Sequence, residues 1–169
     1  MVITPAEAAK MLRKLNEDLS AAEEREKRSR TFNAALGEDV ESVRPAYDFA
    51  AAQKELCDLE DKVRKLKHAP NVFNSTHEVP GFGMTVDQML VFIPQLTRRK
   101  AKLAEMRSRL PKIRAESWGG RRDVIDYVYA NYDIAAVEAE YDRVTEQLGR
   151  AQLELDGVNS RERFEAPLD

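Results

Sequence analysis

Apolar residues recur every three or four positions along four long segments of this chain, which is the spacing of one face of an α-helix. The segments cover about residues 5–35, 48–73, 85–114 and 133–159. The last has an unbroken stripe of Val137, Tyr141, Val144, Leu148, Ala151, Leu155 and Val158. Such narrow stripes are typical of helices that pack in pairs as coiled coils.

Residues that favour helix starts stand at the beginning of these segments. Thr4 with Glu7 and Thr85 with Gln88 have the spacing of capping boxes, and Asp133 can cap the last helix. The pattern therefore predicts an all-α protein, a bundle of four helices in two antiparallel coiled-coil-like hairpins that form a single domain over residues 1–169. Because narrow stripes leave apolar surface uncovered, we also expect a homo-oligomer.

The links and ends add detail to this plan. Residues 76–84 read as a small hairpin around Gly81 and Gly83, and residues 124–132 alternate like a short strand, so the two middle links predict a small β-like element. The first helix is expected to reach about residue 35 as a charged rod. The third is expected to fray near Pro111, and residues 159–169 are expected to have little effect on the fold.

Composition narrows the class of protein. The single cysteine among 169 residues excludes a disulfide framework and a cysteine-based zinc site. No stretch approaches the roughly 20 apolar residues that span a bilayer, and the first residues lack the order of a secretion signal. We expect a cytoplasmic protein that has no membrane partner.

Catalytic and cofactor signatures are missing from the sequence. There is no glycine-rich phosphate loop, nucleophile elbow or zinc-protease motif. His68 and His77 are nine positions apart with no third ligand in evidence. We therefore expect no enzyme activity, no cofactor and no metal.

Positive charge is concentrated in the third helix and the link that follows it. Residues 97–122 hold ten basic and two acidic side chains, whereas the whole chain has a net charge of −3. Lys100 and Arg107 even interrupt the leucine stripe of Leu96, Leu103 and Leu110. Burying an unpaired charge costs several kcal/mol, so these cations need either an acidic protein surface or an anionic ligand.

Two interpretations follow from this basic helix. In one, its cations pair with acidic helices of the same or another protein, as in a structural scaffold or adaptor. In the other, they bind a small anionic ligand, with asparagines to read its polar groups and tyrosines to stack on a base. The candidate ligand residues are Asn71, Asn74, Thr76, Arg98, Arg99, Lys102, Tyr129 and Tyr132, with Arg121 and Arg122 as further phosphate contacts. Nucleic-acid binding is a weaker third interpretation, since the chain is acidic overall.

Residues 65–106 and 127–159 resemble the septicolysin-like family of small bacterial and phage-borne helical proteins. The similar pattern is a helix ending in Asn-x-x-Asn and Thr, a glycine-containing hairpin, a Thr-capped basic helix, and a strand-like piece before an Asp-capped helix. It spans about residues 50–160, and the matching positions are Asn71, Asn74, Thr76, Gly83, Thr85, Asp87, Arg98, Arg99, Lys102 and Asp133.

The resemblance implies an oligomeric helical bundle. The family label also implies a pore-forming toxin, but the stripes here are narrow and offer no broad apolar face for membrane insertion. We therefore expect a non-enzymatic oligomeric binding protein that holds a nucleotide-like or phosphorylated ligand. In a phage or mobile-element setting such a protein would sequester a signalling nucleotide. A coiled-coil scaffold is the alternative.

Overall fold

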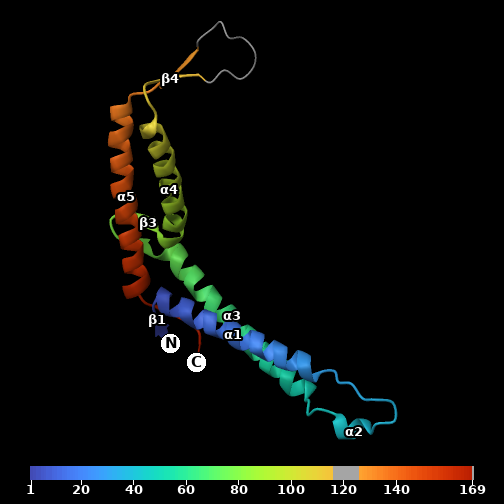
Figure 1. Ribbon diagram of the computed structural model, residues 1–169. Coiled ribbons are helices and arrows are strands. Elements are labelled where there is room, and N and C mark those ends of the chain that lie inside the picture. Colours follow the sequence, from blue (N-terminus) through green and yellow to red (C-terminus); the bar gives the residue numbers. More distant parts are fainter. Residues whose placement is uncertain (116–125, 169) are drawn as a thin grey trace. The chain divides into compact units, whose positions relative to one another are not determined.

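The structure is a computed structural model that describes residues 1–115 and 126–168. Helices make up most of the described part, and the short strands pair as antiparallel two-stranded sheets (Figure 1). The helices are α1 (Pro5–Ser29), α2 (Val40–Val43), α3 (Phe49–Thr76), α4 (Val86–Ser108) and α5 (Ile134–Arg161). The strand pairs are β1 (Val2–Ile3) with β6 (Phe164–Glu165), β2 (Glu78–Val79) with β3 (Met84–Thr85), and β4 (Lys112–Arg114) with β5 (Tyr127–Tyr129). The expected all-α class with minor β elements is confirmed.

Contacts within the chain divide it into two compact units, where the sequence pattern predicts one domain. Unit 1 comprises Met1–His77 and Gly157–Asp169, and unit 2 comprises Glu78–Asp156. Helix α5 contributes to both, since the division falls within it. Unit 2 is therefore one continuous stretch of chain, and unit 1 is built from two stretches.

Unit 1 is an antiparallel pair of α1 and α3, which lie side by side (Figure 1). Small side chains allow the two helices to approach closely, because Ala8 and Ala22 of α1 are 1% and 3% exposed. At the linked end of the pair, Arg25 of α1 binds Glu55 of α3 at 2.6 Å. At the other end, Leu66 is fully buried in a cluster with Ile3, Ala8, Ala69 and Ala166.

The C-terminal residues complete this cluster. Ile3 of β1 pairs with Phe164 of β6, and the Phe164 ring lies 5.2 Å from that of Phe73. Ala166 is only 1% exposed, and Leu168 packs against the same cluster. The expectation that these residues have little effect on the fold is wrong, because alternate side chains of this segment enter the core.

Helix α1 ends at Ser29, so the expected end at about residue 35 is wrong. Arg25 faces Glu55, and in an antiparallel pair the start of α3 at Phe49 then faces about residue 31. Residues beyond that point lie past the first turn of α3 and have no part of that helix opposite them. Helix formers that lack tertiary packing are only marginally helical, so α1 ends where its partner begins.

Unit 2 contains the second antiparallel pair, formed by α4 and residues 134–156 of α5 (Figure 1). The buried stripe of α4 is Val86, Met89, Leu96 and Leu103, and that of α5 begins at Val137 and Val144. Before α4, the β2–β3 hairpin forms as predicted, with Gly81 and Gly83 at φ of +75° and +60°. Two antiparallel helix pairs are therefore present.

Helix α4 ends at Ser108, and the expected end at about residue 114 is wrong. Pro111 has no N–H for the carbonyl of Arg107 and disfavours helical geometry at Leu110. The chain then becomes strand β4, in which Lys112 pairs with Tyr129 of β5. The predicted β-like element is thus two separate hairpins, and each follows one helix of a different pair.

Candidate functional site

The cations that interrupt the leucine stripe of α4 lie over an aromatic ring. The ring centroid of Tyr141, on α5, is 4.2 Å from Cζ of Arg107 and 5.6 Å from Nζ of Lys100. A ring face attracts cations through its quadrupole. The two cations are therefore stabilised within unit 2, and their position requires neither an acidic protein surface nor an anionic ligand.

Arg99 is engaged on the same helix pair. Its Nη2 donates to Glu140 of α5 at 2.6 Å, and Glu140 also accepts two hydrogen bonds from Arg143. The hydrogen bond from Arg143 is the main influence that lowers the pKa of Glu140, and the charges of Arg143 and Arg99 lower it further. Arg99 thus forms part of a surface network that links α4 to α5.

Two predicted ligand contacts on α4, Arg98 and Lys102, are exposed. Within the described residues neither makes an ion pair, whereas Arg109, one turn after Glu105, binds that carboxylate at 2.8 Å. Among the described cations of the predicted ligand set, these two side chains are available to a partner or ligand.

The predicted tyrosines have different environments. The Tyr132 hydroxyl donates to the carbonyl of Met106 at 2.9 Å, which ties the start of α5 to the end of α4. Tyr129 is 61% exposed on β5, and its ring centroid lies 6.4 Å from that of Tyr127. Nζ of Lys112 lies 3.9 Å from the Tyr127 ring and 5.3 Å from the Tyr129 ring. Arg121 and Arg122 lie outside the described residues.

The predicted polar contacts Asn71, Asn74 and Thr76 occupy the last two turns of α3, in unit 1. Asn71 is exposed and Asn74 half-buried, and the Thr76 hydroxyl donates to the carbonyl of Val72. The basic and aromatic contacts belong to unit 2. Neither unit by itself assembles the predicted ligand set.

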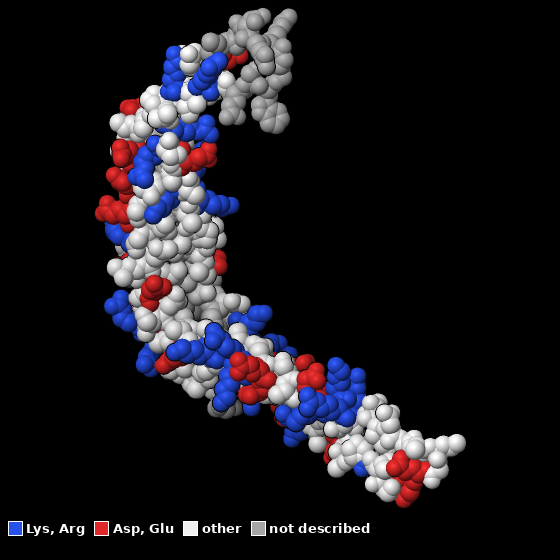
Figure 2. All heavy atoms as spheres, in the orientation of Figure 1, with Lys and Arg blue, Asp and Glu red and all other residues white. Residues whose placement is uncertain are grey.

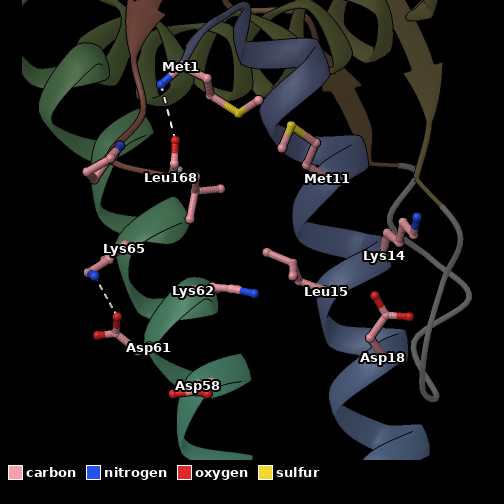
Figure 3. A pocket seen from close by; sticks show the side chains of 11 residues that line it. Met1, Met11, Lys14, Leu15, Asp18, Asp58, Asp61, Lys62, Lys65 and Leu168 are labelled. Atoms are coloured by element: carbon pink, nitrogen blue, oxygen red, sulfur yellow. Dashed lines mark hydrogen bonds and ion pairs between the residues drawn. The ribbon is translucent and has the colours of Figure 1, made fainter. Parts of the chain in front are cut away.

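A groove that the sequence pattern does not predict runs between α1 and α3 in unit 1 (Figure 3). It has a volume of about 630 Å³, and Lys62 of α3 and Leu15 of α1 point toward each other across it. Three lysines and three aspartates line it around an apolar floor: Lys14, Lys62, Lys65, Asp18, Asp58 and Asp61, with Met1, Met11, Leu15, Pro167 and Leu168. The charges balance, so the groove offers no excess positive charge to a phosphate.

The lysines and aspartates that line this groove include an ion pair. Lys65 binds Asp61 at 2.6 Å, and that hydrogen bond is the main influence that lowers the pKa of Asp61. A sequence signal for the groove exists, because Lys14 and Asp18 on one helix, like Asp58 and Lys62 on the other, are four residues apart. An adjoining groove of about 840 Å³ includes Thr76 in its lining.

Two further findings bear on the kind of site. Within residues 1–115 and 126–168, no group of three or more histidine, cysteine or acidic side chains is placed to hold a metal ion. In the same part of the chain, every helix is too short or too polar to cross a membrane.

Comparison with known proteins yields a likeness of fold. No family model matches the chain, and no curated protein matches it. One solved structure, described as that of a functionally unknown conserved protein from Corynebacterium diphtheriae, matches 98% of this chain and 100% of its own, with 16% identity and a TM-score of 0.56. At that identity the likeness concerns architecture alone, and the septicolysin-like resemblance stays a prediction.

Proposed function

We propose that this protein is a non-enzymatic helical scaffold or adaptor that acts through protein–protein contact. The supporting observation is the surface of α4, where ten consecutive residues, Gln88–Thr97, carry no charge on any side of the helix. Leu90 and Val91 in this stretch are 49% and 57% exposed. A helix that is uncharged all round is typical of one with protein on more than one side. In the described part of the chain, α5 and the β2–β3 hairpin, whose Phe82 ring lies 6.4 Å from that of Phe92, pack on α4 and leave Leu90 and Val91 exposed.

The cations of α4 support the same interpretation. Arg99 binds Glu140, and Lys100 and Arg107 lie over Tyr141. Each contact joins α4 to α5, so these side chains stabilise the helix pair. A basic helix of this kind is consistent with a structural element.

The double change Arg98→Ala, Arg99→Ala distinguishes a scaffold from a ligand-binding protein. For a scaffold, heat releases no stoichiometric small molecule from the freshly purified protein, and the double variant changes its oligomeric mass. Arg25→Ala is the control, because it breaks a pair of the same type, with Glu55 in unit 1 and also 2.6 Å long, and should leave the oligomeric mass unchanged. Release of a stoichiometric phosphate-bearing compound that the double variant no longer holds, at an unchanged oligomeric mass, would refute the scaffold proposal.

The second candidate function is the binding of a small anionic, nucleotide-like or phosphorylated ligand, including its sequestration in a phage setting. The β4–β5 hairpin favours it, because Lys112 lies beside two exposed tyrosine rings. Aromatic rings with a neighbouring cation suit a base and its phosphate. Titration of nucleotides against Tyr127→Ala, Tyr129→Ala tests this function, which requires that the double variant lose binding that the parent shows.

Both candidates are proposed for a cytoplasmic setting. The single cysteine, Cys57, is exposed, and an exposed thiol suits a reducing compartment.

A further inference from the structure

The side of α4 that faces away from α5 has a defined composition. At 3.6 residues per turn, Asp87, Leu90, Val91, Pro94 and Arg98 lie roughly opposite the buried stripe that contacts α5. We name these five residues the outer face of α4. All five are exposed, and the surface over the N-terminal half of α4 is largely uncharged (Figure 2).

Charges of opposite sign close the outer face at its two ends. Asp87 precedes the uncharged stretch and Arg98 follows it. Among the described residues neither side chain forms an ion pair, although the next residue, Arg99, binds Glu140. The face therefore has an apolar middle, one free acid and one free base.

Two copies of the outer face have complementary charges when they pair antiparallel, but not when they pair parallel. When two copies of the outer face meet antiparallel and centred on the uncharged stretch, Asp87 of each copy lies opposite Arg98 of the other. Val91 then faces Pro94, so apolar side chains fill the centre. A parallel arrangement would place Asp87 beside Asp87 and Arg98 beside Arg98, and like charges repel.

We infer that the partner of α4 is a second copy of this chain, joined through the outer face as an antiparallel, two-fold symmetric helix pair. An isologous interface of this type uses the same residues on both subunits, and here each side supplies both members of an ion pair. The inference rests on the proposed scaffold function and names its partner.

Charge reversal tests the inference, with sedimentation equilibrium of the full chain over a range of concentrations as the measurement. The wild type should form a dimer. Asp87→Arg and Arg98→Asp should each weaken the dimer about tenfold or more, because two ion pairs become two like-charge contacts. The double exchange should restore the association. Lys102→Asp is the matched control, since it makes the same change of charge one turn beyond the outer face and should leave the dimer intact.

Val91→Arg provides a second route that does not alter the helix start at Asp87. Each copy then brings one arginine into the apolar centre, so the change should also abolish the dimer. Circular dichroism should show the same helix content as in the wild type. A wild type that stays monomeric, or a dimer in which the double exchange does not recover the loss, would overturn the inference. Either result would still be compatible with a scaffold whose partner is a different protein. A stoichiometric ligand released by heat would instead contradict the scaffold proposal itself.

Discussion

Replacement of Tyr141 by leucine tests whether its ring stabilises the cations on the stripe of α4. The ring lies 4.2 Å from Arg107 and 5.6 Å from Lys100. Cation–π contacts at accessible sites contribute about 0.5–1 kcal/mol each, and they act only within about 6 Å of the ring centroid. Lys100, which lies near that distance limit, should therefore contribute less stabilisation than Arg107. We therefore expect Tyr141→Leu to lower the free energy of unfolding by about 1–1.5 kcal/mol, since leucine keeps most of the apolar contact.

Urea titration followed by far-UV circular dichroism is the suitable assay, because urea is uncharged and leaves the screening of these cations unchanged. Tyr141→Phe is the control: it keeps the ring and should cost less than about 0.5 kcal/mol. In a double-mutant cycle with Arg107→Met, the coupling to Tyr141 should be about 0.5–1 kcal/mol. A coupling near zero, or a loss in Tyr141→Phe as large as that in Tyr141→Leu, would refute the role of the ring.

Three further predictions concern other parts of the chain. The pKa of Glu140 lies below its ordinary value of 4.5 in the folded protein. The Glu140 carboxylate therefore stabilises the fold fully above pH 4.5, and this stabilisation is lost as the pH falls through the lowered pKa. In Glu140→Gln, the urea midpoint should therefore fall less steeply as the solution is acidified. Gly83→Ala should destabilise the protein by about 1 kcal/mol because Gly83 has a positive φ. Gly149→Ala, within α5 and with open space around it, should stabilise the protein by about 0.5–1 kcal/mol, and urea titrations in which both variants change the free energy of unfolding in the same direction would contradict this. Ala166→Asp should cost about 2 kcal/mol or more, since it buries a carboxylate in the core cluster, and an unchanged melting temperature would rule that out.

Helix positions could be predicted from sequence because an apolar stripe is a local pattern. The stripe of α5 from Val137 to Val158 is buried at nearly every position. The position of a helix end depends on how far the partner helix extends opposite it, and a local sequence pattern does not contain that information. Thus α1 ends at Ser29 because α3 offers no further contact, and the pairing of β1 with β6 joins segments whose residues are too few to form a pattern.

The candidate site could be predicted only in part. The charges at Lys100 and Arg107 led to the expectation of an acidic protein surface or an anionic ligand, whereas the structure places both cations over the ring of Tyr141. Which residue faces these cations depends on the register between α4 and α5, and Tyr141 reads in the sequence as an ordinary stripe residue. Likewise, Asn71 and Arg98 are both exposed polar candidates, but local sequence does not show that they belong to different units.

The pairing of β1 with β6 has a consequence for the order in which the chain folds during synthesis. The amino group of Met1 donates to the carbonyl of Ala166, 165 positions away, whereas all residues of unit 2 lie in one continuous stretch. Unit 2 therefore contains every segment that it needs to fold, and none of them is β6. Unit 1 begins to form earlier, but the end of its core around Leu66 stays open until β6 arrives, and closing so long a loop is slow. The unit that is synthesised first should be the one that is completed last.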